Sequence, residues 1–151
     1  MSSAETSNPE IEQRVQAGIK HFEETMGHLP VQMKTLSTHM PDVFAGYMDI
    51  RQWAMRDPPK GAMPRKYKHL ILTLLDCVYG NGPGAENHAR AGLRRGLTID
   101  EFLEGIALLF IVGGIGVYGI TGYKVLDNVL ASEEGLAALK KRGSQTPVAE
   151  S

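Results

Sequence analysis

The chain has only one cysteine, Cys77, among its 151 residues. A single cysteine excludes a disulfide within the chain and any Cys-x-x-Cys redox pair, and it fits a reducing compartment. The first ten residues, MSSAETSNPE, also lack the basic and apolar regions of a secretory signal peptide. We therefore expect a cytoplasmic protein.

The chain has little excess charge, with a formal net charge of −1. This balance gives no reason to expect nucleic acid or an anionic membrane surface as a partner. The most apolar run, 106–112, continues into a glycine-rich segment and is too short and too interrupted to span a membrane. We expect it to form a core helix that packs closely against other helices.

The sequence shows neither strand alternation nor an internal repeat, and its apolar residues recur at helical spacing. Hydrophobic residues make up 42% and charged residues 22%, as in soluble globular proteins. The sequence predicts an all-α protein with a disordered N-terminus at 1–8, one helical domain at 9–142 and a flexible tail at 143–151.

Prolines, glycines and apolar spacing predict where the helices lie. The expected segments are 9–27, 30–39, 41–57, 65–79, a helix ending near 95 after a glycine-rich break at 80–84, a helix from 98 through 110, an apolar, glycine-punctuated segment to about 130, and a short helix at 133–142.

One helix start carries two independent signals. Thr98 and Glu101 have the spacing of a capping box, and Leu97 and Phe102 fit a hydrophobic staple. Gly96 fits the position that closes the preceding helix. The two signals agree that a helix begins just after Thr98.

The helix expected at 65–79 has an unusual polar stripe. His69, Thr73 and Asp76 are spaced i, i+4 and i+7, so they share one face of a helix that is apolar on nearly every other side. Buried polar groups of this kind need hydrogen-bond partners. His88 follows just across the glycine-rich break, and these residues form the candidate site.

Two motifs around this site, PRKYKHLILTLLD and NHARAGLRRGLTIDEFLEGI, stand in order on either side of the glycine-rich break. This arrangement, over about residues 40–130, resembles the carboxymuconolactone decarboxylase/alkylhydroperoxidase-D-like superfamily. The resemblance implies an all-helical fold that assembles into trimers or hexamers, with small-molecule chemistry near a subunit contact.

The chain departs from the peroxidase branch of that superfamily. Counting back from His88, the two cysteines of that branch's CxxCxxxH pattern fall on Asn81 and Gly84, and its proton-relay glutamate falls on His69. Thiol peroxidase chemistry needs a reactive thiolate, so these substitutions argue against it. We expect Cys77, within an apolar helix, to be a packed small hydrophobe.

The decarboxylase branch keeps the histidine without the cysteines, although its acidic segment is here 81–85 with Glu86 nearby. Cofactor-free decarboxylation needs a proton donor for the resulting enolate, and we assign that role to His88, assisted by His69. Asp76 is a candidate to hold a histidine tautomer, and a structural hydrogen-bonding role is its alternative. Backbone N–H groups near Gly84 are candidates to bind a substrate carboxylate.

The remaining candidates each have a plainer alternative. Arg90 is either a carboxylate clamp or a solvent-facing arginine, and Glu86 is either a substrate contact or part of a solvated helix face. Tyr79 is either a hydrogen-bond donor to substrate or a packing residue. The predicted function is cofactor-free decarboxylation or proton transfer on a small carboxylated or lactone-type metabolite.

Two other hypotheses remain open from the sequence. His69, Asp76 and His88 are residue types that bind zinc, iron or manganese, although they lack a recognised metal-site spacing. The second hypothesis is a non-catalytic helical oligomer that binds a small ligand or supports a partner enzyme. In every case, apolar, glycine-rich faces predict a homo-oligomer.

Overall fold

The computed structural model describes residues 8–145. Most of the predicted disordered N-terminus and the end of the predicted C-terminal tail lie outside the described residues. Asn8, at the edge of that N-terminal segment, caps the first helix, because its side chain accepts a hydrogen bond from the Glu10 N–H at 3.0 Å. The helix predicted at 133–142 continues to Gln145.

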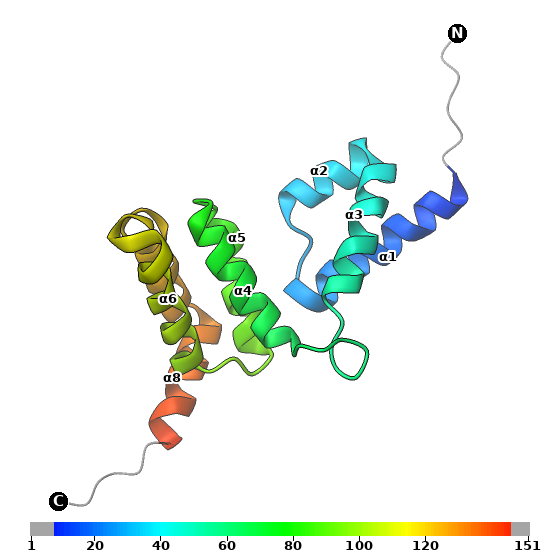
Figure 1. Cartoon of the computed structure of the whole chain (residues 1–151). Helices are drawn as coiled ribbons and strands as arrows, with labels where there is room; N and C mark the ends of the chain where they lie inside the picture. The colour runs from blue at the N-terminus through cyan, green and yellow to red at the C-terminus, as the bar shows by residue number, and fades with distance from the viewer. Residues whose placement is uncertain (1–7, 146–151) are drawn as a thin grey trace, which may run out of the picture. The chain divides into compact units, whose positions relative to one another are not determined.

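Within residues 8–145 the structure is helical and has no strand, which confirms the all-α class (Figure 1). Its elements are α1 (Pro9–Met26), α2 (Val31–His39), α3 (Pro41–Ala54), α4 (Arg65–Val78), α5 (Gly82–Arg94), α6 (Ile99–Val117), the π-helical turn η1 (Tyr118–Gly122), α7 (Tyr123–Ala131) and α8 (Glu133–Gln145). They form two compact units that divide after Arg56.

The first unit is built from α1, α2 and α3. Gly18 lets α1 approach α3 closely, because a Cβ there would lie 2.6 Å from Met48 Cγ and 2.7 Å from Phe44 Cε1. The guanidinium of the buried Arg51 lies 4.3 Å from the centre of the Phe22 ring.

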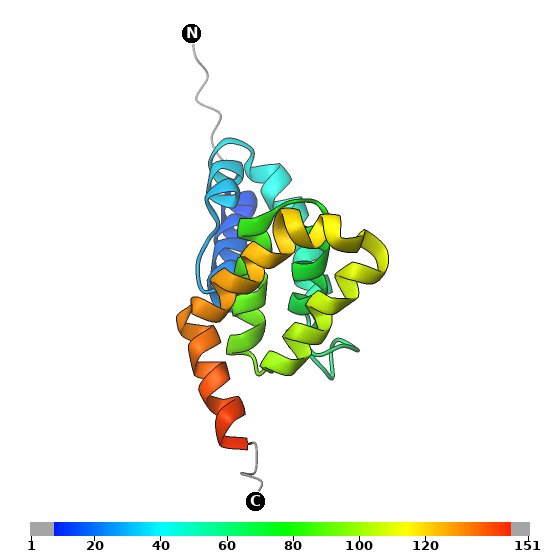
Figure 2. The same cartoon turned by 90° about the vertical axis from the view of Figure 1, so that its left-hand side faces the viewer.

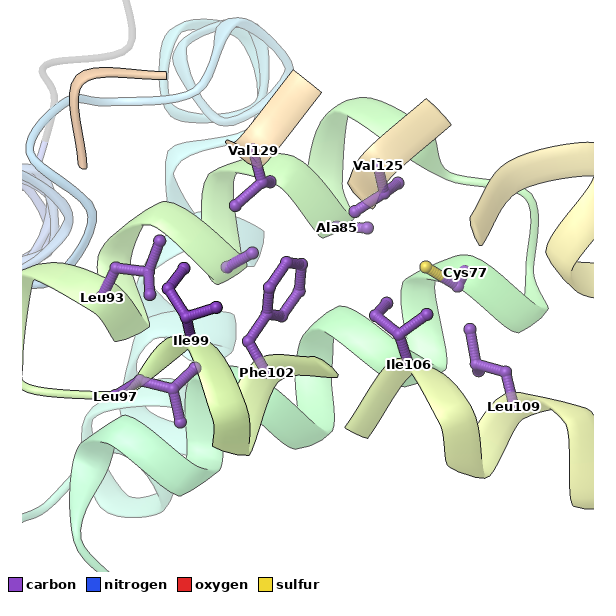
Figure 3. Packing of buried hydrophobic residues seen from close by; sticks show 11 residues of the cluster. Cys77, Ala85, Leu93, Leu97, Ile99, Phe102, Ile106, Leu109, Val125 and Val129 are labelled. Atoms are coloured by element: carbon purple, nitrogen blue, oxygen red, sulfur yellow. The ribbon is translucent and has the colours of Figure 1, made fainter. Parts of the chain in front are cut away.

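The second unit contains α4 to α8 and the larger core. Buried side chains from α4, α5, α6 and α7 meet in one cluster, seen from close by in Figure 3. Its members are Cys77, Ala85, Ala89, Leu93, Leu97, Ile99, Phe102, Ile106, Leu109, Val125 and Val129. Alanines on α5 keep that helix close to its neighbours, while α6 contributes the large side chains.

The connection from α5 to α6 follows the sequence prediction. Gly96 has a positive φ of 88°, its N–H bonds to Leu93 O at 3.1 Å, and the Leu97 N–H bonds to Gly92 O at 3.0 Å. These two bonds form a Schellman motif, and the left-handed backbone favours glycine.

The capping box that begins α6 is also confirmed. Thr98 Oγ1 accepts from the Glu101 N–H at 3.1 Å, and Glu101 Oε2 accepts from the Thr98 N–H at 2.8 Å. Lys66 and Tyr67 add bonds from α4, at 2.9 Å and 2.7 Å to Glu101 Oε1. Glu101 therefore joins the N-termini of α4 and α6.

The segment from α6 to α7 reverses direction through a kink (Figure 2). Gly114 has non-helical angles, φ 60° and ψ −168°, and the π-helical turn η1 follows. By length and composition alone, 99–131 is apolar enough to cross a membrane. The kink interrupts that stretch.

The expected close-packed core helix is only partly found. The first half of α6 buries one face, but its second half exposes an apolar stripe in the isolated chain. The stripe consists of Leu108, Ile111, Val112 and Ile115. The sequence pattern did not separate the buried part from the exposed part, because the apolar run at 106–112 extends across both.

Candidate functional site

The hairpin of α4 and α5 buries the polar stripe predicted on α4. His69 and Thr73 are completely buried. Both face α5: a Cβ on Gly92 would lie 3.4 Å from His69 Cβ, and Thr73 Oγ1 is 3.4 Å from Ala85 O. Small residues on α5 therefore leave space for polar side chains of α4.

The hairpin brings His69 and His88 together. Their Nδ1 atoms lie 3.0 Å apart, and the ring centres are 5.3 Å apart with an interplanar angle of 39°. His69 is buried and His88 is half-buried. One Nδ1 must donate and the other accept, so in the neutral pair the two rings are different tautomers.

This geometry limits how many protons the pair can hold. One added proton turns the donor ring into an imidazolium and leaves the Nδ1–Nδ1 bond intact. A second proton would place two N–H groups against each other and break the bond. The pair can therefore accept and release one proton while its geometry stays fixed.

Thr73 supports the histidine pair from within α4. Its hydroxyl donates to His69 O at 2.9 Å. The hydroxyl is thus satisfied by the backbone, as buried hydroxyls in helices commonly are. Thr73 lies on the predicted polar stripe, one turn from His69, and it fills the hairpin interior.

Asp76 lies on the same stripe but bonds to the turn between the two helices. Its Oδ1 accepts from Asn81 Nδ2 at 2.9 Å. Burial raises the pKa of the Asp76 carboxyl, and the hydrogen bond from Asn81 opposes this effect. The structure therefore places Asp76 in the hairpin turn, whereas the sequence hypothesis gave it the role of orienting a histidine.

Gly84 is held in the same turn. Its N–H donates to Asn81 Oδ1 at 3.2 Å, and the Ala85 N–H donates to Asn81 O at 3.0 Å. These bonds occupy the N–H groups that the sequence hypothesis assigned to a substrate carboxylate. A Cβ on Gly84 would lie 2.2 Å from Asn81 Nδ2 and 2.7 Å from Asp76 Oδ2, so a larger residue would have to displace these two side chains.

Arg90 joins α5 to α8. Its Nε lies 2.9 Å from Glu134 Oε2, and Arg94 Nη1 lies 2.5 Å from Glu134 Oε1. Burial alone would raise the pKa of Glu134, but the hydrogen bonds from Arg90, the Glu134 backbone N–H and Arg94 lower it to about 2. Arg90 is thus part of a helix–helix ion pair.

Glu86 and Tyr79 lie on the outside of the hairpin. Glu86 Oε1 accepts from Asn128 Nδ2 on α7 at 2.7 Å. Tyr79 follows α4 directly and is 85% exposed. Neither observation assigns these residues a substrate. Glu86 contacts α7, and the exposure of Tyr79 does not fit the packing role considered for it.

Cys77 is buried in the core, as expected for a packing residue. Burial, with a smaller contribution from Asp76, raises the pKa of its thiol to about 11. The thiol is therefore protonated at neutral pH, which makes it a poor nucleophile.

Sequence reasoning missed two residues that organise this region, Asn81 and Glu134. Asn81 had a local signal, because asparagine directly before Gly-Pro is a typical helix N-cap. Glu134 is 44 residues from Arg90, and no local pattern connects them.

The residues that could hold a metal ion are not gathered. Within residues 8–145, no group of three or more His, Cys, Asp and Glu side chains is arranged to bind one. Asp76, one of the three residues considered for such a site, is hydrogen-bonded to Asn81.

The fold and the sequence match a solved structure. The crystal structure of a putative carboxymuconolactone decarboxylase from Burkholderia xenovorans LB400 is 32% identical, with a TM-score of 0.75, over 90% of this chain and 98% of that chain. A scan against protein-family models finds no match, and neither does a comparison with curated proteins. The chain belongs to the carboxymuconolactone decarboxylase/alkylhydroperoxidase-D-like superfamily.

Proposed function

We propose that this protein is a carboxymuconolactone decarboxylase-like enzyme that acts on a small carboxylated or lactone-type metabolite without a cofactor. The observation that carries the proposal is the His69–His88 pair, with its 3.0 Å Nδ1–Nδ1 contact inside the α4–α5 hairpin. The similarity to the Burkholderia protein supports the class of chemistry.

In the proposed reaction, the electron pair of the bond to the carboxylate moves toward a β-carbonyl oxygen as carbon dioxide leaves. The resulting enolate carbon then takes a proton from His88 in its imidazolium form. Because His88 Nδ1 is engaged with His69, we assign Nε2 of His88 to the substrate. His69 keeps the ring of His88 oriented and stabilises its charged form.

Carbon dioxide release from a panel of carboxylated lactones and β-keto acids tests this proposal. We expect turnover by the wild type and a loss of about 10²–10⁴-fold in kcat in His88→Ala, the usual contribution of a general acid. His69→Gln should lower kcat less and alter the pH profile, as expected of a positioning residue. His39→Ala, an exposed histidine on α2, is the matched control.

Two outcomes contradict the proposal. Unchanged turnover in a folded His88→Ala variant would remove His88 from the mechanism. A wild-type protein without turnover, whose melting temperature nevertheless rises saturably with one of these compounds, would favour the alternative of a non-catalytic ligand-binding protein.

We further propose that the chain is a cytoplasmic homo-oligomer, a trimer or hexamer. Support comes from the apolar side chains that the isolated chain exposes on α4 and α6, since monomers rarely expose large contiguous apolar surfaces. On α4 these are Ile71, Leu75 and Val78; on α6 they form the stripe described above. Partners of this surface would be other copies of the chain.

A further inference from the structure

A basic hollow lies at the end of the α4–α5 hairpin opposite the Asn81 turn, where α4 begins and α5 ends. Its volume is about 450 Å³. It is lined by Asp57, Pro64, Arg65, Lys66, Arg94 and Arg95. Four cationic side chains and one carboxylate therefore surround this space.

Three of the cations also pair with carboxylates. Arg65 Nε lies 3.3 Å from Asp57 Oδ2, Lys66 Nζ bonds Glu101, and Arg94 bonds Glu134. Glu101 and Glu134 do not line the hollow, so Asp57 is the acidic side chain that faces it. Counted against all three carboxylates, the four cations of the lining still leave a net positive charge.

The cations of the hollow influence one another. Burial lowers the pKa of the Arg95 guanidinium, repulsion from Arg65 lowers it further, and attraction by Asp57 opposes both. Arg94 adds a smaller repulsion. Three guanidinium groups are therefore close enough to repel, and an anion between them would relieve this repulsion.

We propose that this hollow binds the phosphate group of a small molecule. A guanidinium offers donors in a planar fork that matches two oxygens of an oxyanion, and three guanidiniums with one ammonium offer more N–H donors than the three carboxylates of Asp57, Glu101 and Glu134 can accept. A phosphate group has more acceptor oxygens and carries up to two negative charges. The site is separate from the histidine pair and does not depend on the proposed reaction.

Inorganic phosphate is the probe for the first experiment. Its binding is measured by isothermal titration and by the melting temperature, at constant ionic strength balanced with sodium chloride. Phosphate should raise the melting temperature of the wild type in a saturable way, because it binds the folded state. Arg95→Gln should weaken binding by about tenfold, as expected for the loss of one charge-assisted contact.

Asp57→Asn gives a test that loss of folding cannot imitate. The Arg65 N–H bonds Asp57 Oδ1 at 2.7 Å, and asparagine keeps an oxygen for this bond while it removes the competing charge. This variant should bind phosphate several-fold more tightly than the wild type. Lys140→Gln on the exposed face of α8, and His88→Ala, should bind as the wild type does.

Three results would overturn the proposal. One is equal stabilisation by chloride, which would show general screening. Another is phosphate binding that is unchanged in both Arg95→Gln and Asp57→Asn. The third is binding of acetate as tight as that of phosphate, which would make the hollow a carboxylate site.

Discussion

The two faces of α4 are inverted relative to an ordinary amphipathic helix. The face toward α5 carries His69 and Thr73, both completely buried, while the outer face exposes Ile71 and Leu75 to 44% and 50%. In an ordinary surface helix of a globular protein, Ile71 and Leu75 would face the core, and His69 and Thr73 would face water. The inversion fits the proposed homo-oligomer, in which the inner face packs against α5 and the outer face would pack against another copy of the chain.

The inner face is polar because α5 supplies hydrogen bonds and space. His69 has His88 across the hairpin, Thr73 has backbone oxygens, and Asp76 has Asn81. Each of these three side chains therefore has at least one defined partner, which helps to fix the register of the two helices. The outer face has no such directional groups, and it gains free energy only when apolar surface is covered.

The largest expected effect is on assembly. In Ile71→Glu/Leu75→Glu, two charges enter the outer face of α4, and burying them against another chain would cost several kcal/mol. We expect the variant to have the mass of a single chain by light scattering, with its helix content retained. Lys140→Glu, on the exposed face of α8, is the control and should keep the wild-type mass. A wild type that is itself a single chain would contradict this view of the outer face.

The next largest effect is on stability and concerns Gly84, in the turn where the polar inner face of α4 ends. Gly84→Ala places a Cβ 2.2 Å from Asn81 Nδ2, so the Asn81 side chain must leave its position. The loss of this cap and the steric conflict should cost about 2–3 kcal/mol in the free energy of unfolding, measured with urea. Gly46→Ala on α3 is the control, because a Cβ there has open space, and it should stabilise slightly. Equal stability of Gly84→Ala and wild type would show that the turn is not tightly packed.

The end of α5 and the start of α6 could be predicted because their signals are local. The capping box of Thr98 and Glu101 and the terminal glycine Gly96 act within a few residues, and the structure contains both as expected. The start of α5 was less clear, because Gly82 and Gly84 lie inside the helix, whereas glycine usually marks a break.

The candidate site was only partly predictable. His69 and His88 meet because two helices in sequence form a hairpin, so their spacing along the chain was informative. The partner of Arg90 was not predictable, because Glu134 arrives from α8 through the packing of three intervening elements. Asp76 has a local partner five residues away, Asn81, which agrees with the structural hydrogen-bonding role that the sequence left open beside the catalytic one.

The ion pairs that connect the hairpin to α6 and α8 should make the free energy of unfolding depend on pH. The pKa values of Glu101 and Glu134 are about 2 in the folded state, below the ordinary value of 4.5. Their stabilisation is therefore complete above about pH 4.5 and is lost as the pH falls toward 2. Since both side chains are partly exposed, we expect about 1–2 kcal/mol from each. Urea unfolding at pH 7 and pH 3 should show a smaller difference in Glu134→Gln than in the control Glu104→Gln. An identical pH dependence in both variants would contradict this account.

The smallest expected effect concerns Thr73 on the inner face of α4, where two substitutions remove its hydroxyl and its methyl group separately. Thr73→Val keeps the shape but removes the hydroxyl that bonds His69 O, and Thr73→Ser keeps the hydroxyl but removes a methyl group. A carbonyl that retains its helical partner loses little, so each change should cost about 1 kcal/mol in the free energy of unfolding. The two variants should differ in the histidine pair, because only the valine variant removes the bond that fixes the backbone beneath His69. Nitrogen NMR of the imidazole rings should then show an altered tautomer balance in Thr73→Val and an unchanged one in Thr73→Ser. The same spectrum in both would mean that Thr73 contributes only packing, and that the polar inner face of α4 is organised by His69 and Asp76 alone.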